Sequence, residues 1–551
     1  MEQSLKIIPL GGLGEIGKNM MALEYGDDIV VIDAGVMFPD EGMLGVDLVI
    51  PDISYLKKNR DRVRAILVTH GHEDHTGALP YVLRDLAVPV FAPRLAQGLI
   101  EVKLREHRSL RDSRVEPVEP GYPVSLGNFS VEWFRVCHSI PDAMGLAIKT
   151  PLGLIIHTGD FKIDHTPVDG APTDLGKLAA LTSEGVLLLF SDSTYAEVPG
   201  YTLSESVVGE ALERVIATAQ GRVLVATFAS LISRIQQVLD AAQKYGRKVA
   251  FVGRSMVDNV KMALRMGYIS VADGVIVTPR EIKELSPEKV VVMTTGSQGE
   301  PTSALVRIAN NEHRDVHIVS GDTVVISATA IPGNERVVSK TIDNLLRQGA
   351  QVLHDKIALV HVHGHASQEE LKLILNLTRP QYFVPVHGEH RHLKAHAALA
   401  NTMGISQENT YVLENGDVLE INRQYAEITG RVTAGPIFVD GFRVMDVKNV
   451  VLRDRRLLSK DGIVVIVVTR DKKTGNLLKM PEIVSSGFID IDEHSEITEG
   501  AIDAVMDVFN NNVNQSLEQG LINTKIEQVV GDFLYAQTGR RPMIVPAVED
   551  V

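Results

Sequence analysis

One short segment constrains this chain more than any other: Thr69-His70-Gly71-His72-Glu73-Asp74-His75. It places three imidazoles and two carboxylates within six positions, directly after the apolar run at residues 65–68. Packing and solubility require no such density, whereas neutral imidazole and carboxylate together suit borderline divalent ions such as zinc or manganese. A solvated polar loop is the alternative, but isolated histidines rather than a cluster would be typical of it. The segment therefore predicts a metal site.

The apolar run before this segment predicts a short buried strand, so the histidines should lie on the loop at its carboxyl end. Residues 76–79 then open the next helix. Strand ends are where α/β proteins place their chemistry. His70 and His72 alternate onto one side of an extended backbone, whereas Asp74 and His75 lie beyond the turn. This arrangement favours two metal ions over one.

The length and the cysteine content limit the class of protein. At 551 residues the chain is too long for one hydrophobic core, and its length suggests roughly three to four domains. Its single cysteine, Cys137, excludes an intramolecular disulfide, and the first residues carry no signal-like pattern. We therefore expect a protein of the reducing cytoplasm. No apolar stretch is long enough to span a bilayer, so we expect no membrane partner.

The charge balance bears on possible nucleic-acid partners. A formal net charge of −15 argues against a general nucleic-acid coat protein. A local groove is compatible with that charge, because two bound divalent ions would reverse the potential at the site itself. Any nucleic acid is therefore expected to bind locally.

The pattern of elements changes along the chain. Up to about residue 200, β-branched runs alternate with glycine-marked turns, and several runs end directly in Asp or His. After that the pattern is typical of a parallel α/β unit. The elements expected there are helices at 204–220 and 232–245 and strands at 223–226, 249–252 and 316–319. A later strand at 382–386 leads straight into His387, so metal-type residues reappear after this insert. The first domain is therefore expected to be split around the second.

A third unit is expected near the carboxyl terminus. A strand at 463–468 and helical apolar spacing from Ile497 to Phe509 mark it, and an arginine-rich stretch before the strand predicts a linker. The expected division is 1–205 for the first part of the metal-binding domain, 206–365 for the insert, 366–447 for the second part, 448–462 for the linker and 463–551 for the carboxyl-terminal domain.

Further ligand candidates follow strand-like runs elsewhere in the chain. A dinuclear centre needs about three to four protein ligands per ion and one group that bridges the pair. His138 ends one run, and Asp160 ends another and could bridge through its two oxygens. A structural histidine and a turn-capping aspartate are the alternatives for each in isolation. Asp33 could orient a ligand histidine from behind. Gly11-Gly12-Leu13-Gly14 lacks the Walker lysine and predicts a tight turn.

These residues carry a family resemblance. The run His70-x-His72-x-Asp74-His75, with His138, Asp160 and His387, resembles the metallo-β-lactamase superfamily. Asp192 in Ser191-Asp192-Ser193-Thr194 and His365 in His361-Val362-His363-Gly364-His365 bound an insert similar to that of its nucleic-acid-processing β-CASP branch. Over essentially its whole length, the chain is similar to bacterial ribonuclease J. The resemblance implies an α/β fold, with a metallo-β-lactamase αββα sandwich split by an inserted α/β β-CASP domain, plus a small α+β carboxyl-terminal domain.

The resemblance also implies roles for individual residues. His70, His72 and His138 would hold one ion, Asp74, His75 and His387 the other, and Asp160 would bridge them. The expected catalytic residues are His365, which would stand beside the scissile phosphate, Asp74 and Asp192, which would support the site from behind. Substrate phosphates would be gripped by His365 together with Ser230, Arg234, His361 and Ser367. His361 and His365 can share a face of this segment, whereas His363 points elsewhere and is expected to be structural.

The implied activity is that of a metal-dependent ribonuclease with 5′-to-3′ exonuclease and endonuclease action on single-stranded RNA, preferably 5′-monophosphorylated. A hydroxide bridging two divalent ions would attack phosphorus and leave 5′-phosphates. His365 would steady the transition state or protonate the leaving group. Zinc is the expected metal and manganese the alternative. The resemblance further implies a role in RNA maturation and decay, a homodimer or tetramer, and a place in an RNA-degradation complex.

Three other functions share parts of this pattern. A small-molecule hydrolase would use the same metal motif but would not need the insert. A β-CASP nuclease acting on DNA would share both. A non-catalytic RNA-binding scaffold of the same fold would usually have lost ligands, whereas every expected position is filled here. Release of mononucleotides from RNA, and its sensitivity to a chelator, would separate these functions.

Overall fold

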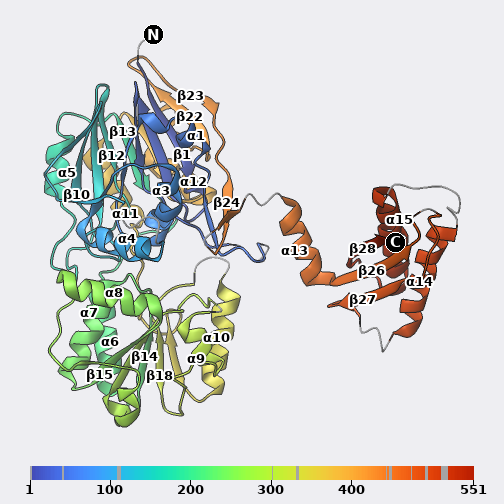
Figure 1. Cartoon of the computed structure of the whole chain (residues 1–551). Helices are drawn as coiled ribbons and strands as arrows, with labels where there is room; N and C mark the ends of the chain where they lie inside the picture. The colour runs from blue at the N-terminus through green and yellow to red at the C-terminus, as the bar shows by residue number, and fades with distance from the viewer. Residues whose placement is uncertain are drawn as a thin grey trace. The chain divides into compact units, whose positions relative to one another are not determined.

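The computed structural model describes residues 3–39, 43–107, 113–300, 302–330, 334–441, 443–445, 449–472, 474–489, 494–510 and 519–551. The chain divides into two compact units (Figure 1). The first comprises Met1–Phe38 and Leu48–Val444, and the second comprises Pro39–Asp47 and Met445–Val551. Among the described residues, no helix combines the length and the apolar character needed to cross a membrane.

Two sheets face each other in the larger part of the first unit. One has the order β23-β22-β1-β3-β4-β6-β7-β8 and the other β20-β13-β12-β11-β10-β9. The strands of the first are β1 (Leu5–Gly11), β3 (Met20–Tyr25), β4 (Asp28–Ile32), β6 (Val63–Leu67), β7 (Val90–Pro93), β8 (Val115–Val118), β22 (Asp417–Ile421) and β23 (Ala426–Arg431). Those of the second are β9 (Val124–Leu126), β10 (Phe129–Arg135), β11 (Met144–Thr150), β12 (Gly153–His157), β13 (Leu188–Asp192) and β20 (Tyr382–Val386). Buried side chains of both sheets form one core between them.

Helices cover the outer face of each sheet. On the first sheet lie α3 (Leu79–Asp85) and α4 (Arg94–Glu106), whose apolar side chains share a core with β1, β3, β4 and β6. On the second lie α5 (Leu175–Thr182), α11 (Gln368–Thr378) and α12 (His390–Thr402). The layers are therefore helix, sheet, sheet and helix, which confirms the αββα sandwich. Short elements complete this part: α1 (Ser54–Lys58), β5 (Leu48–Pro51) paired with β24 (Pro436–Asp440), and β25 (Arg443–Met445) beyond β24.

The second sheet shows how the first domain is split. β13 pairs in parallel with β12 on one side and with β20 on the other. Leu188 thus faces Tyr382, and Asp192 faces Val386, although the insert separates these strands in sequence. Because the carboxyl ends of β12, β13 and β20 meet at one edge, residues that follow them are brought together.

The insert forms a parallel sheet of its own, in the order β16-β15-β17-β14-β18-β19. Its strands are β14 (Val223–Ala226), β15 (Lys248–Val252), β16 (Ile276–Val277), β17 (Val290–Thr294), β18 (Thr323–Ile326) and β19 (Gln351–His354). Helices α6 (Ser206–Thr218), α7 (Ile232–Lys244) and α8 (Arg254–Met266) pack on one face, and α9 (Ala304–Ala309) and α10 (Glu335–Arg347) on the other. Covering both faces is typical of a parallel sheet.

One strand expected in the insert is wrong. Residues 316–319 form no strand, and the next strand begins at Thr323. Val316 and Ile318 are nevertheless buried in the core between the sheet, α9 and α10. The alternating apolar residues thus indicate burial of this segment, although its backbone is not paired with a neighbouring strand. The helices at 204–220 and 232–245 and the strands at 223–226 and 249–252 are confirmed within a few residues.

The second unit is a small α+β domain. Its sheet has the order β27-β26-β28, from β26 (Ile463–Arg470), β27 (Glu482–Ser486) and β28 (Met543–Asp550). Helices α14 (Ser495–Asn510) and α15 (Gln519–Thr538) share its core. The stretch expected as a linker at 448–462 holds helix α13 (Asn449–Asp461). Arg455 of this helix donates hydrogen bonds to the carbonyl oxygens of Leu44 and Gly45 within the same unit, so the arginine run belongs to a helix rather than to an irregular connection.

Candidate metal centre

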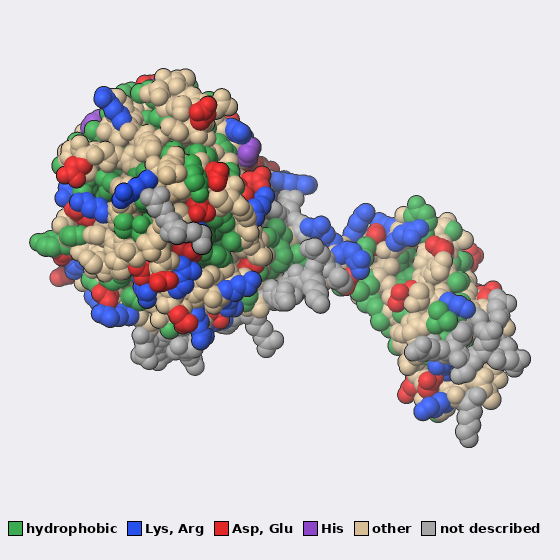
Figure 2. All heavy atoms as spheres, turned by 90° about the horizontal axis from the view of Figure 1, so that it is seen from above, with side chains coloured by type: hydrophobic (Ala, Val, Ile, Leu, Met, Phe, Trp, Pro, Cys, Tyr) green, Lys and Arg blue, Asp and Glu red, His purple; other side chains and the backbone are tan. Residues whose placement is uncertain are grey.

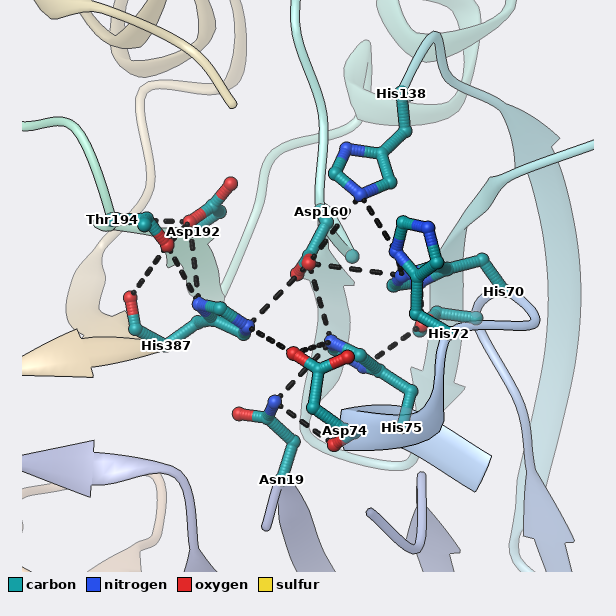
Figure 3. A network of polar contacts seen from close by, with 12 residues as sticks. Asn19, His70, His72, Asp74, His75, His138, Asp160, Asp192, Thr194 and His387 are labelled. Carbon is teal, nitrogen blue, oxygen red and sulfur yellow. Dashed lines mark hydrogen bonds and ion pairs between the residues drawn. The ribbon is translucent and has the colours of Figure 1, made fainter. Parts of the chain in front are cut away.

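Histidine and aspartate side chains from five separate segments converge at the shared strand edge (Figure 3). The loop after β6 supplies His70 and His72, and the short helix α2 (Glu73–Thr76) supplies Asp74 and His75. The remaining side chains follow or end other strands: His138 after β10, Asp160 after β12, Asp192 at the end of β13 and His387 after β20. The structure therefore brings together all seven expected metal ligands.

Three imidazoles form the first ligand set. Nδ1 of His72 lies 3.1 Å from Nε2 of His70 and 3.1 Å from Nε2 of His138. Tetrahedral zinc with bonds of about 2.0–2.1 Å would place its ligand atoms about 3.3 Å apart, so this spacing fits one ion. Burial lowers the pKa of His72 to about 4 and holds the pKa values of His70 and His138 well below the ordinary value. All three rings are thus neutral at pH 7, which is the form that binds a metal.

The second set combines carboxylates and imidazoles. Nε2 of His387 lies 3.3 Å from Oδ2 of Asp74, and Nε2 of His75 lies 3.6 Å from the same oxygen. Burial alone would lower the pKa of His387, but the carboxylates of Asp160 and Asp74 outweigh it and raise the pKa to about 9. A mixed oxygen and nitrogen set of this kind fits zinc or manganese.

Asp160 lies between the two sets. Its Oδ2 is 3.7 Å from Nε2 of His70 and 3.8 Å from Nε2 of His138 in the first set. The same oxygen is 3.2 Å from Nε2 of His75 and 3.4 Å from Nε2 of His387 in the second. The side chain is 3% exposed, so a lone carboxylate here would be costly without positive partners. Its position suits a group that bridges two ions.

Asp33 holds the second set from behind. Its Oδ2 lies 2.8 Å from Nδ1 of His75 and accepts a hydrogen bond from the hydroxyl of Thr69, while Oδ1 accepts from the backbone N–H of Thr69. The backbone of Asp33 has φ of 59°, a left-handed conformation that Asp and Asn adopt more easily than other residues with a side chain. The sequence expectation for Asp33 agrees with this geometry.

Two supporting residues were not predicted. The side-chain amide of Asn19 donates to the carbonyl oxygen of Asp74 and lies 3.2 Å from Nε2 of His75. The hydroxyl of Thr194 lies 2.7 Å from Nδ1 of His387 and donates to Oδ1 of Asp192. Thr194 follows Asp192 by two positions, and this proximity was its only signal in the sequence. Asn19 lies five positions after the predicted turn at Gly11–Gly14 and is close to no predicted site residue in the sequence.

His365 lies at the rim of the cluster. Its Nδ1 is 2.7 Å from Oδ2 of Asp192, and its ring centroid is 4.9 Å from that of His138. Burial lowers the pKa of His365, but the Asp192 carboxylate outweighs it and raises the pKa above the ordinary value. The side chain is 17% exposed, more than those of His70, His75 or His138. It can therefore reach a molecule bound at the centre.

The other residues expected to contact substrate phosphates lie outside the two ligand sets. Arg234 is fully buried, and its Nη1 donates to Nδ1 of His361 at 3.0 Å. The hydroxyl of Ser367 is buried against that of Thr202 at 2.9 Å, while Ser230 is half-buried just before α7. Among the described residues, no hydrogen bond or ion pair joins Ser230, Arg234, His361 or Ser367 directly to the seven ligands.

Comparison with protein families covers most of the chain. The matching models are those of the metallo-beta-lactamase superfamily (residues 13–166), the ribonuclease J beta-CASP domain (220–345), the Zn-dependent metallo-hydrolase RNA specificity domain (351–413) and the ribonuclease J C-terminal domain (450–551). Ribonuclease J 1 of Streptococcus pyogenes is 45% identical to this chain over 98% of it and 97% of the relative. The chain belongs to the ribonuclease J family. Ribonuclease J2 of Bacillus subtilis is 42% identical over 100% of this chain and 99% of its own, and ribonuclease J of Thermus thermophilus is 44% identical over 99% and 95%.

A solved structure also shares the fold. A protein of unknown function from Enterococcus faecalis matches with a TM-score of 0.53 at 16% identity, over 76% of this chain and 100% of that one. At this identity the likeness concerns the fold alone. The donor chemistry and the spacing of the two ligand sets agree with the metal-binding character of the ribonuclease J family.

The variant Asp33→Asn is expected to weaken metal binding by about 10-fold to 100-fold, because His75 loses the carboxylate that orients its ring. Asparagine tolerates the left-handed backbone of Asp33 and keeps its size, so folding should be retained. Competition with a chromophoric chelator measures the affinity. Asp27→Asn, at an exposed position of the same domain, is the control. Equal zinc affinities for Asp33→Asn and wild type would contradict this role of Asp33.

Metal binding by the second set is expected to strengthen as pH rises. In the metal-free protein His387, with a pKa of about 9, carries a proton through the neutral range. The carboxylates of Asp160 and Asp74 also outweigh burial at His75 and hold its pKa well above the ordinary value. An incoming ion must therefore displace a proton from both rings, so its affinity should rise by about tenfold or more per pH unit through the neutral range. The first set, with His72 near a pKa of about 4, has no proton to lose there. Calorimetric zinc titrations at several pH values test this, and two pH-independent affinities would contradict it.

Proposed function

We propose that this chain is a metal-dependent ribonuclease that hydrolyses phosphodiester bonds of single-stranded RNA. The observation that carries the proposal is the shared Oδ2 of Asp160, which lies within 3.8 Å of imidazole nitrogens from both ligand sets. Two adjacent ions are the usual means of stabilising both the attacking and the leaving oxygen of a phosphodiester. The ribonuclease J names of the relatives, and the RNA specificity domain matched at 351–413, favour RNA over DNA.

The chain's residues supply binding, orientation and proton transfer. When bound, the ions would make water a nucleophile near neutral pH and screen the charge of the phosphate. Attack on phosphorus breaks the bond to the 3′ oxygen, which leaves the phosphate on the 5′ end of the downstream fragment. His365 gives a proton to the departing 3′ oxygen, and Asp192 holds the ring and keeps that proton on it. Asp33, Asn19 and Thr194 fix the ligands.

RNA recognition on this chain should be local. On the face in view, basic and acidic side chains of the first unit alternate over short distances (Figure 2), and the net charge is −15. Attraction would therefore come from the bound ions and from polar groups near them, with backbone contacts rather than base reading. Ser230 is our candidate for one phosphate contact. Action from a 5′-monophosphorylated end and internal cleavage are both proposed, on the family's pattern.

We further propose zinc as the native metal with manganese as the alternative, a cytoplasmic location, and participation in an RNA-degradation complex. A homodimer or tetramer is also proposed, supported by apolar side chains such as Val484 and Val545 that are 56% and 36% exposed on the sheet of the second unit. Light scattering on the purified protein measures the oligomeric state, and a monomer would contradict the last proposal.

The activity is tested with 5′-monophosphorylated single-stranded RNA and DNA of the same sequence, each with and without a chelator. The expected result is release of mononucleotides from RNA, lost with chelator and restored by zinc or manganese. Preferred hydrolysis of DNA would support the DNA nuclease instead. Tight RNA binding with no release under any metal would support the non-catalytic scaffold.

A further inference from the structure

Arg234 is a buried cation whose three nitrogens are all hydrogen-bonded. Nε donates to Oε1 of Glu205 at 2.7 Å, and Nη2 contacts the same oxygen. Nη1 donates to the carbonyl oxygen of Ser327 at 2.9 Å and to Nδ1 of His361 at 3.0 Å. The side chain is 0% exposed. A guanidinium that is fully buried and hydrogen-bonded through all three nitrogens is not accessible to a substrate phosphate.

The partners of Arg234 lie where the chain passes between the two domains of the first unit. Glu205 comes immediately before α6, where the chain goes into the insert. His361 follows β19, where the chain returns toward the metal centre. Arg234 itself lies in α7 of the insert. One side chain thus ties together both crossover segments.

The network continues to the metal centre on the Glu205 side. The backbone N–H of Glu205 donates to Oδ2 of Asp164 at 3.2 Å. Lys162 lies 3.5 Å from the same carboxylate oxygen and donates to the carbonyl oxygen of Leu203 at 3.0 Å. Lys162 and Asp164 belong to the loop after β12 that carries Asp160. The entrance to the insert is therefore bound to the loop of the shared carboxylate.

On the His361 side the network ends at His365. The hydroxyl of Thr202 donates to the carbonyl oxygen of His365 at 2.8 Å. The ring of His363 stacks on Tyr195, with centroids 3.6 Å apart and an interplanar angle of 8°. Nδ1 of His363 also lies 2.9 Å from the carbonyl oxygen of His365, so Thr202 and the stacked His363 together hold the backbone that carries the His365 ring.

We propose that Arg234 is a positioning residue: it holds His361 as a neutral hydrogen-bond acceptor and so places His365 at the metal centre. This inference rests on the proposed function of His365. It differs from a phosphate-binding role for Arg234 and His361, because neither residue would touch RNA. Burial and the neighbouring guanidinium lower the pKa of His361 to about 3, in keeping with a ring that accepts and stays uncharged.

A matched pair of variants tests the acceptor. In His361→Asn the side-chain oxygen can take the place of Nδ1 and accept from Arg234, whereas His361→Leu leaves the Nη1 donor without that partner. We expect His361→Asn to keep kcat within about threefold and His361→Leu to lower kcat about tenfold or more, with KM and metal content unchanged in both. An equal loss in both variants would overturn the proposal.

The chemical group at the 5′ end of the RNA distinguishes a positioning role of Arg234 and His361 from a phosphate-binding role. Each variant is compared on 5′-monophosphorylated and 5′-hydroxyl RNA. Positioning lowers kcat by the same factor on both substrates, because the placement of His365 does not depend on the 5′ end. A rise in KM confined to the 5′-monophosphorylated RNA would show a phosphate contact and overturn the proposal.

The ion pair is tested with a double variant, since Arg234→Leu alone leaves the buried Glu205 carboxylate unpaired and can unfold the protein. Arg234→Leu/Glu205→Leu removes both charges and should fold with a Tm close to wild type, yet have kcat lowered about tenfold or more. Arg265→Met, at an exposed position of α8, is the control. Full kcat in the folded double variant would overturn the proposal, whereas a wild type that degrades no RNA would overturn the proposed function and this inference together.

Discussion

The variant Asp160→Asn is expected to lose bound metal and to hydrolyse RNA about 10³-fold more slowly than wild type. Asparagine has the shape of aspartate but no charge, and a neutral amide is a poor bridging ligand. Burial would raise the pKa of Asp160, but His387 and His75 outweigh it and hold the pKa well below the ordinary value, so the carboxylate is ionised at neutral pH. The substitution therefore removes a full negative charge from the space between the two ligand sets.

Metal analysis by mass spectrometry and digestion of end-labelled RNA measure the two effects on the same samples. Asp61→Asn is the matched control, because the side chain of Asp61 is 94% exposed and lies outside the ligand sets. Circular dichroism verifies that Asp160→Asn is folded. Full occupancy by two ions in the folded variant would contradict the bridging role, and normal activity without metal would contradict the metal-dependent function.

The ligand sets could be predicted because each ligand lies in a local pattern. His70, His72, Asp74 and His75 occur together after an apolar run, and Asp160 and His387 each follow another. The carboxyl ends of strands that pair in parallel meet at one edge, so local signals in distant segments indicated a single site. The parallel pairing of β12, β13 and β20 places the residues that follow these strands close together, and this forms the candidate metal centre.

Residues that act through tertiary contacts could not be assigned in this way. Asn19 precedes β3, and it reaches Asp74 and His75 because β3 pairs with β4 and β4 pairs with β6, which leads into the loop of these ligands. For Arg234 the family resemblance implied a phosphate contact, whereas its complete burial beside Glu205 favours the positioning role proposed above. Its pairing with Glu205 depends on how α7 packs over the start of α6. A sequence does not show which charges become buried together.

The fold shows the same limit. Alternation of strand and helix patterns was sufficient for the insert, but at 316–319 the spacing of Val316 and Ile318 predicted a strand where a core-packed extended segment lies. Hydrophobic spacing reports burial, while a strand also needs a neighbour with free backbone groups. The stretch predicted as a linker at 448–462 contains helix α13, whose many charged residues indicated a connection but did not by themselves indicate a helix.

The variant His365→Ala is expected to keep both metal ions and to lower kcat by about 10²-fold to 10⁴-fold, the range for loss of a general acid. The structure leaves a second role to test, because Asp160, Asp192, His365 and His387 offer ligand atoms within 4.8 Å of one another. A ligand role predicts depleted metal in His365→Ala. Metal analysis of the variant therefore decides between the two, and depletion would contradict the assignment of His365 to proton transfer.

Proton transfer by His365 is tested further with RNA in which sulfur replaces the bridging 3′ oxygen. Sulfur leaves as a thiolate without first gaining a proton, because a thiol is far more acidic than an alcohol. His365→Ala should then cleave the sulfur linkage about as fast as wild type does, while remaining slow on the oxygen linkage. Asp192→Asn should show part of the same effect on the oxygen linkage. The His365 ring then loses the carboxylate, 2.7 Å from its Nδ1, that keeps the ring protonated. If alanine at position 365 slowed both linkages by the same factor, His365 would act by orienting the phosphate rather than by donating a proton.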